Sequence, residues 1–329
     1  MSTSQMSSKD TSTAQHGDLV ALSAGSGWDL LPPEYRIPAM PPDLAEAQAY
    51  CARLARSHYE NFSVATWFLP AHLRQDFYNV YAYCRISDDL GDEVGDPQQS
   101  LALLDQWESE LEACYSGSPR HAVFVALRET VRKFDIPKQE FSDLLTAFRQ
   151  DQTVTRFPTF KDVLAYCRYS ANPVGHLVLY LCGYRDAERQ RLSDFTCTAL
   201  QLANFWQDAE RDYAKGRIYL PLEDMKSFGV TEADIAGKRA TPEFIELMRF
   251  EVTRAREWFE QGLPLIHRVD RSLALDLELF SRGGQEILNA IEKQNFDVLT
   301  SRPVISKPRK LWLLVSAGMK SLTRNGQAS

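Results

Sequence analysis

Apolar side chains recur at intervals of three and four residues along most of this chain of 329 residues. That spacing places them on one face of an α-helix, so the pattern predicts helices. Asp43 followed by Glu46 is typical of a capping box and begins the first of them. We expect a kink at Pro173, because proline removes a backbone hydrogen bond. The predicted helices span residues 43–60, 71–93, 98–115, 121–134, 138–150, 159–181, 187–213, 242–267 and 272–296.

Alternation of apolar and polar residues, which indicates a strand, is scarce, and residues 217–222 are its best example. The chain is therefore predicted to be all-α, with one domain over residues 40–300 whose helices can surround a cavity. Residues 1–27 are rich in Ser, Thr and Gly and are predicted to form a disordered tail. In residues 301–329 basic residues flank an apolar patch. This tail is either an interfacial helix on anionic lipid or a last helix packed on the domain.

Composition narrows the class of protein. Lys and Arg number 37 and Asp and Glu 44, a net charge of −7 that argues against nucleic acid as a partner. The six cysteines form no CxxC pair and indicate reduced, buried thiols rather than disulfides or a zinc site. No apolar run reaches the roughly 20 residues of a membrane span, and the chain starts without a signal-peptide pattern. We expect a cytoplasmic protein, with peripheral contact to the inner face of the membrane through the C-terminal tail left open.

Two acidic clusters at helical spacing are the candidates for chemistry. Asp88 and Asp92 are four residues apart and share one face of their predicted helix. Asn204, Asp208 and Asp212 form a row at the same spacing on another helix. Like charges at this spacing destabilise a helix by about 0.2–0.5 kcal/mol, and the apolar neighbours raise the cost through burial. A bound cation would offset that cost.

Oxygen ligands without His or Cys favour Mg²⁺, or Mn²⁺, over zinc. Mg²⁺ normally completes its shell with water and substrate phosphates, whose remaining charge Arg85, Lys215 and Arg217 could meet. The alternative for either cluster alone is a solvated acidic face. Both clusters together, each within an apolar helix, favour an Mg²⁺-dependent enzyme that acts on a diphosphate and has an apolar cavity for the rest of its substrate.

Longer stretches around these clusters resemble the squalene/phytoene synthase family. YAYCRISDDLGDE at 81–93 and LQLANFWQDAERDYAKGRIYLP at 200–221 look like its two aspartate-rich motifs. YCRYSANPVGHLVLYLCGY at 166–184 is similar to its third signature. Within the family, ENFSVATWFLP at 60–70 and NFWQD at 204–208 most resemble the bacterial hydroxysqualene synthases of hopanoid biosynthesis.

The chain departs from most squalene and phytoene synthases at two places. Those enzymes usually have an arginine immediately before the middle aspartate of the second motif, where this chain has Gln207. They also usually have a small hydroxyl and a basic residue after the histidine of the first helix, where Tyr59, Glu60 and Asn61 follow His58. Less positive charge fits an enzyme that takes one diphosphate already condensed, rather than two.

The resemblance implies a type I isoprenoid synthase (terpenoid synthase) fold, with the acidic motifs facing each other across a central cavity. It implies Mg²⁺ ligands at Asp88, Asp92, Asn204, Asp208 and Asp212. It places near the diphosphate His58, Asn61, Tyr81, Arg85, Arg217 and Tyr219. It places along the prenyl channel Phe62, Tyr166, Ala171, Val174, Gly175 and Gln201. Outside the metal motifs a structural role is the alternative: helix packing for Ala171 and Gly175, or a salt bridge for Arg85.

The leading hypothesis is hydroxysqualene synthase activity. Mg²⁺ would stabilise the diphosphate that leaves presqualene diphosphate, and one water would capture the cation, positioned by Gln201 or Gln207. NADPH is not expected as a cofactor, and other enzymes of the pathway are candidate partners. The alternatives are a squalene or phytoene synthase that condenses two prenyl diphosphates, and an inactive family member that acts as an assembly factor.

Overall fold

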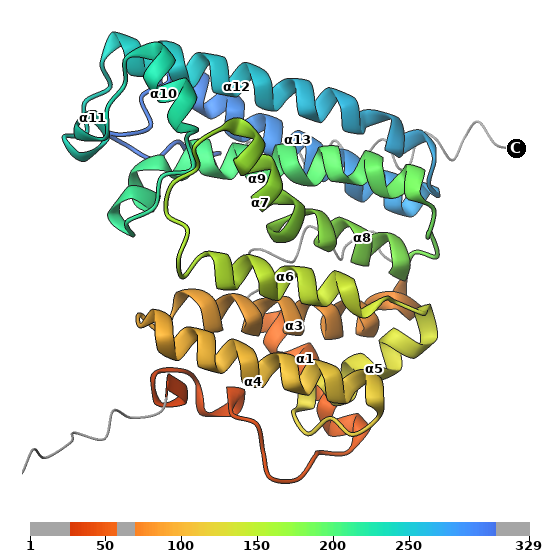
Figure 1. Ribbon diagram of the computed structural model, residues 1–329. Helices are drawn as coiled ribbons and strands as arrows, with labels where there is room; N and C mark the ends of the chain where they lie inside the picture. The colour runs from red at the N-terminus through yellow and green to blue at the C-terminus, as the bar shows by residue number, and fades with distance from the viewer. Residues whose placement is uncertain (1–26, 58–69, 307–329) are drawn as a thin grey trace, which may run out of the picture.

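The computed structural model describes residues 27–57 and 70–306, and its regular structure is helical throughout (Figure 1), which confirms the all-α prediction. No strand occurs in these described ranges, where a single isolated bridge joins Arg156 and Ile218. Residues 217–222, the best candidate for a strand in the sequence, form none there, as the all-α prediction requires. Ile218, Tyr219 and Leu220 are all buried, so this segment is a connection that packs on the core and not a strand with one exposed face.

The helices follow the predicted ones to within a few residues, apart from two short ones, α10 and α11, that the apolar pattern does not reveal. Four short 3₁₀ turns of the described residues are η1 (Gly27–Leu30), η2 (Pro33–Tyr35), η3 (Ala71–Leu73) and η4 (Leu263–His267). The α-helices of the described residues are α1 (Leu44–Ser57), α3 (Arg74–Asp92), α4 (Pro97–Ser116), α5 (Ala122–Phe134), α6 (Lys138–Gln150), α7 (Phe160–Ser170), α8 (Asn172–Leu181), α9 (Ala187–Ala214), α10 (Leu222–Phe228), α11 (Glu232–Ala236), α12 (Pro242–Gly262) and α13 (Arg271–Lys293).

The segment predicted as one kinked helix over 159–181 forms two helices, α7 and α8. Thr159 and Asp162 make a capping box that begins α7. The chain leaves helical geometry at Ala171, whose φ is −124°. Pro173 is the second residue of α8, a position whose N–H has no partner within a helix, so proline costs no hydrogen bond there. The break lets α7 and α8 run in different directions between the two halves of the molecule (Figure 1).

Each half of the molecule has its own hydrophobic core. The first contains buried residues of α1, α3, α4, α5 and α6, with Trp107 and Tyr83 fully buried in it. The second contains residues of α7, α9, α12 and α13, with Trp206 and Phe259 at its centre. In Figure 1 the first group lies in the lower half and α9, α12 and α13 in the upper half, with α7 and α8 between them. The space between the halves is where a site can form.

Some packed residues lie outside the predicted domain limits of 40 and 300. Trp28 and Tyr35 are buried in the first core, and Pro303 is buried next to α9. The predictions for the N-terminal tail and for the C-terminal basic tail fall on residues 1–26 and 307–329, which lie outside the described residues. Within the described part, no helix is long and apolar enough to cross a membrane.

Candidate active site

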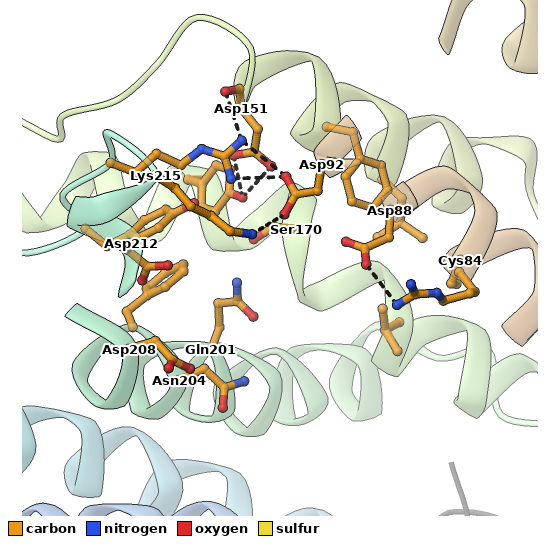
Figure 2. A pocket seen from close by; sticks show the side chains of 18 of the residues that line it. Cys84, Asp88, Asp92, Asp151, Ser170, Gln201, Asn204, Asp208, Asp212 and Lys215 are labelled. Atoms are coloured by element: carbon orange, nitrogen blue, oxygen red, sulfur yellow. Dashed lines mark hydrogen bonds and ion pairs between the residues drawn. The ribbon is translucent and has the colours of Figure 1, made fainter. Parts of the chain in front are cut away.

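A pocket of about 440 Å³ lies between α3 and α9, and the two acidic clusters form its opposite walls (Figure 2). Because each cluster repeats every four residues, its members share one helix face, and both faces line the pocket. Residues from α6, α7 and the segment after α9 close its sides. The lining includes Tyr81, Arg85, Asp88, Asp92, Asp151, Tyr166, Val174, Gln201, Asn204, Phe205, Asp208, Asp212, Lys215, Arg217 and Tyr219.

The α3 wall has two carboxylates in different surroundings. Asp92 is 3.2 Å from a guanidinium nitrogen of Arg217 and 3.4 Å from Nζ of Lys215. Asp88 is 3.7 Å from the guanidinium of Arg85. Burial and the neighbouring charge of Asp92 raise the pKa of Asp88 to about 6. Asp88 shares this counter-ion with Asp89, which lies closer to the Arg85 guanidinium, at 2.5 Å.

The α9 wall repeats this arrangement. The guanidinium of Arg302 binds both carboxylate oxygens of Asp208, at 2.5 and 2.8 Å. Burial and the adjacent Asp208 raise the pKa of Asp212 to about 7. Each wall thus presents one carboxyl that protein cations neutralise and one that they neutralise only in part.

This arrangement fits divalent cations that the protein carboxylates and the phosphates of a substrate bind together. Among the described residues, no three His, Cys, Asp or Glu side chains lie close enough together to hold a metal ion by themselves. Mg²⁺ needs only one or two carboxylates when phosphate oxygens and water supply the rest of its shell. Burial and repulsion between carboxylates raise the pKa values of Asp88 and Asp212. A bound cation would lower both pKa values again, because it favours the charged carboxylates.

The position of Arg85 is compatible with both of its predicted roles, diphosphate binding and a salt bridge. It lines the pocket, and it forms an ion pair with Asp89 at 2.5 Å. Asp89 points away from the pocket lining and accepts a hydrogen bond from the hydroxyl of Tyr35 at 2.7 Å. Asp89 therefore holds the guanidinium in place, while Asp88 and Asp92 remain toward the pocket.

Asp151 is a pocket residue that the sequence analysis missed. It follows the last residue of α6 and accepts hydrogen bonds from the hydroxyl of Tyr166 at 2.8 and 3.0 Å. Burial raises the pKa of its carboxyl to about 6, against the opposing charge of Arg217. No periodic pattern marks Asp151, because it is a single acid at a helix end.

Aromatic rings form one side of the pocket. Phe205 and Tyr219 stack with their ring centroids 3.8 Å apart, and the ring of Tyr166 lies 5.7 Å from that of Tyr219. Tyr166 and Tyr219 were predicted near the substrate, whereas Phe205 was not among the predicted site residues. All three are buried and also line the pocket, so Phe205 belongs to both the core and the pocket.

A second cavity of about 280 Å³ adjoins the pocket, since Tyr81, Cys84 and Val174 line both. Its lining is mainly apolar and includes Gly175, which the resemblance places along the prenyl channel. Ala171 lines neither cavity; it joins α7 to α8. The predicted site residues His58, Asn61 and Phe62 lie outside the described residues.

Gln207 points away from the pocket. Its amide donates to the carbonyl of Pro303 at 2.6 Å and accepts from the guanidinium of Arg302 at 3.0 Å. The idea that Gln207 positions a water is therefore wrong, and Gln201 is the glutamine that lines the pocket. A guanidinium still stands beside Asp208, although it comes from residue 302 instead of residue 207.

Comparison with known proteins assigns the architecture. A family model described as squalene/phytoene synthase matches residues 55–309. The chain belongs to the squalene/phytoene synthase family. Squalene synthase HpnC from Alicyclobacillus acidocaldarius is 45% identical, with 82% of this chain and 98% of that chain covered and a TM-score of 0.73. A dehydrosqualene synthase is 29% identical, with 85% and 98% covered and a TM-score of 0.77.

Curated relatives include the phytoene synthase of Arthrospira platensis, which is 30% identical over 301 residues, covering 85% of this chain and 95% of that protein. This squalene/phytoene synthase chain therefore has the terpenoid synthase fold and is an isoprenoid diphosphate-using synthase. Enzymes of the family use a divalent metal with diphosphate substrates, so the inactive alternative has no support from its relatives.

Proposed function

We propose that this synthase is a hydroxysqualene synthase, which ionises presqualene diphosphate and lets one water capture the cation. The observation that carries the proposal is the resemblance of ENFSVATWFLP at 60–70 and NFWQD at 204–208 to bacterial hydroxysqualene synthases. The 45% identity to squalene synthase HpnC, compared with 28–31% to the phytoene synthases, agrees with that branch of the family. The products are hydroxysqualene and diphosphate, so no reductant enters the balance. The pathway would be squalene and hopanoid biosynthesis.

We infer that Asp88 and Asp92 on one wall, and Asn204, Asp208 and Asp212 on the other, hold Mg²⁺ together with the substrate diphosphate. Bound Mg²⁺ would stabilise the negative charge of the departing diphosphate. The fit rests on the donor set, which is oxygen only, and on the carboxyls that protein cations leave partly unpaired.

Three cationic side chains at the pocket would complete the diphosphate site. Arg85, Lys215 and Arg217 line it, and each already contacts a motif carboxylate. Their charge binds the diphosphate and holds it after the carbon–oxygen bond breaks.

The hydrocarbon would occupy the apolar part of the pocket and the second cavity. The faces of Tyr166, Phe205 and Tyr219 can stabilise positive charge on carbon, and their packing excludes bulk water. Gln201 lines the pocket one turn before Asn204 and is the residue we assign to position the captured water.

The second candidate is a phytoene or squalene synthase that condenses two prenyl diphosphates. Two observations favour it: the phytoene synthases match over most of the chain, and Arg302 restores a guanidinium beside Asp208. The charge argument from Gln207 therefore does not separate the candidates, and the distinction falls to product analysis.

The deciding experiment supplies purified protein and Mg²⁺ with presqualene, farnesyl or geranylgeranyl diphosphate, each with and without NADPH. We expect hydroxysqualene from presqualene diphosphate without reductant. Phytoene from geranylgeranyl diphosphate, or squalene formed only with NADPH, would refute the proposal. Asp208→Ala should abolish turnover with unchanged far-ultraviolet circular dichroism, whereas Asp297→Ala, which changes an acid that caps the turn at 299–300, should keep it.

A further inference from the structure

The second cavity has one carboxyl group in its lining. Helices α3, α8, α9 and α13 enclose it, and most of its lining is aliphatic or aromatic, such as Phe77, Leu200 and Phe280. Asp276 of α13 also lines it and is 2% exposed. An acid is out of place in such a lining, because an apolar wall gives a carboxyl nothing to bond to.

Neither carboxylate oxygen of Asp276 has a hydrogen-bond partner among the described residues. Burial, with a smaller contribution from the charge of Asp270, raises the pKa of Asp276 to about 8. At neutral pH the group is thus mostly a neutral acid that can donate and accept one hydrogen bond each. A water in the cavity is the partner that would satisfy it.

The reach of the cavity can be estimated along α9, on which Ser193 is the lining residue farthest from the acidic motif. Ser193 and Thr196 line the cavity together with Asp276. Ser193 lies eleven residues before Asn204 of the second acidic motif, which is about 16 Å along the helix axis. Each isoprene unit adds four chain bonds, about 5 Å when extended, so a farnesyl arm is about 15 Å long and a geranylgeranyl arm about 20 Å.

We propose that Asp276 and its water form a polar floor that limits the site to prenyl arms of three isoprene units. The inference rests on the proposed function, since it concerns the arms of that substrate. A three-unit arm ends above the carboxyl and leaves its hydration intact. A four-unit arm has to displace the water and bury the carboxyl without a partner.

The chemistry makes this floor selective. A purely apolar pocket rejects a longer hydrocarbon weakly, because one more methylene changes affinity little unless it clashes. A polar group that must give up its hydrogen bonds rejects a longer arm more strongly. The free-energy penalty corresponds to a preference of about 10- to 100-fold for the shorter arm. Selectivity would therefore come from one side chain that bonds to nothing in its wall.

Equilibrium binding tests the floor without turnover. Isothermal titration with Mg²⁺ and the unreactive thiolodiphosphate analogues of farnesyl and geranylgeranyl diphosphate gives the ratio of the two affinities. We expect the wild-type protein to bind the farnesyl analogue at least about tenfold more tightly. Asp276→Leu and Asp276→Ala should reduce the ratio to below about threefold, mainly by tighter binding of the longer analogue.

Asp276→Asn is the matched control, because its amide keeps a hydrated polar floor of the same size and should keep the preference. Equal binding of both analogues by the wild-type protein, or an unchanged ratio in folded Asp276→Leu and Asp276→Ala, would overturn the inference. A merely structural role would move both affinities together and leave their ratio unchanged. If the wild-type protein forms no hydroxysqualene, the proposed function is refuted, but the ratio of the two affinities is not affected.

Discussion

Gly175 of α8 lies in close contact with α9, and its substitution tests that contact. A Cβ built at Gly175 would lie 2.2 Å from Oγ of Ser193 and 2.6 Å from Sγ of Cys197. Both distances are far below van der Waals contact, so Gly175→Ala forces two side chains to turn or the helices to separate. The resemblance left open whether this glycine serves packing or the channel; Gly175 packs closely on α9 and also lines the second cavity.

The expected change in stability is the difference of two terms. Overpacking a well-filled contact costs about 1–3 kcal/mol. Alanine in place of glycine within a helix returns about 0.5–1 kcal/mol. Gly175→Ala should therefore lower the free energy of unfolding by about 1–2 kcal/mol. In a Ser193→Ala, Cys197→Ala background the clash is gone, and the same substitution should be neutral or stabilising.

Urea unfolding followed by circular dichroism at 222 nm measures these differences. Gly283→Ala is the control, because Gly283 is inside α13 and a Cβ there meets no atom within 4 Å. It should raise stability by about 0.5–1 kcal/mol. The reasoning fails if Gly175→Ala is as stable as Gly283→Ala, or if the Ser193 and Cys197 substitutions do not rescue it.

Three further predictions concern other contacts. Burial opposes a charged His176, but hydrogen bonds to Asp194 and Glu140 outweigh it and raise the pKa of His176 to about 9. The stability that the charged histidine contributes is therefore full below pH 6.5 and is lost as the pH rises through 9. The melting temperature of His176→Gln should differ less from that of the wild type at pH 9.5 than at pH 6. Arg302→Ala should lower the free energy of unfolding in urea by about 1 kcal/mol, because its guanidinium is 2.5 Å from Asp208. Arg211→Ala should lower it by less than about 0.5 kcal/mol, because that guanidinium is more exposed and 3.8 Å from Asp208. Equal losses in the two variants would contradict this prediction. Deleting residues 308–329 should weaken sedimentation with anionic vesicles but not with neutral ones, and unchanged binding would rule out an interfacial helix.

Local patterns in the sequence predicted most of the fold. The helices are recognisable because the apolar period is a property of neighbouring residues, and the acidic clusters because i and i+4 share a face on any helix. The two exceptions follow the same logic. The short helix α11 is five residues long and offers less than two turns of pattern. In the segment 217–222, Ile218, Tyr219 and Leu220 all pack into the second core, and among the described residues only an isolated bridge to Arg156 pairs with it.

Residues brought together from distant parts of the chain could not be predicted in this way. Asp151 is 63 residues from Asp88, and nothing in its surroundings marks it as the partner of Tyr166 and Arg217. Arg302 is 94 residues from Asp208, yet it binds both oxygens of that carboxylate. Such contacts depend on how helices pack, which the periodicity of a single helix does not record.

The pair of Gln207 and Arg302 shows why this matters for function. Read along the chain, Gln207 removes a positive charge from the second motif and argues for a substrate with a single diphosphate. In the folded protein Arg302 hydrogen-bonds to Gln207 and places its guanidinium on Asp208, so the charge is supplied from the C-terminal side of the domain. The polar end of the pocket therefore does not distinguish one diphosphate from two. The apolar end does offer a distinction, because Asp276 limits how far an arm can extend there, and the choice between three and four isoprene units also separates presqualene from phytoene chemistry.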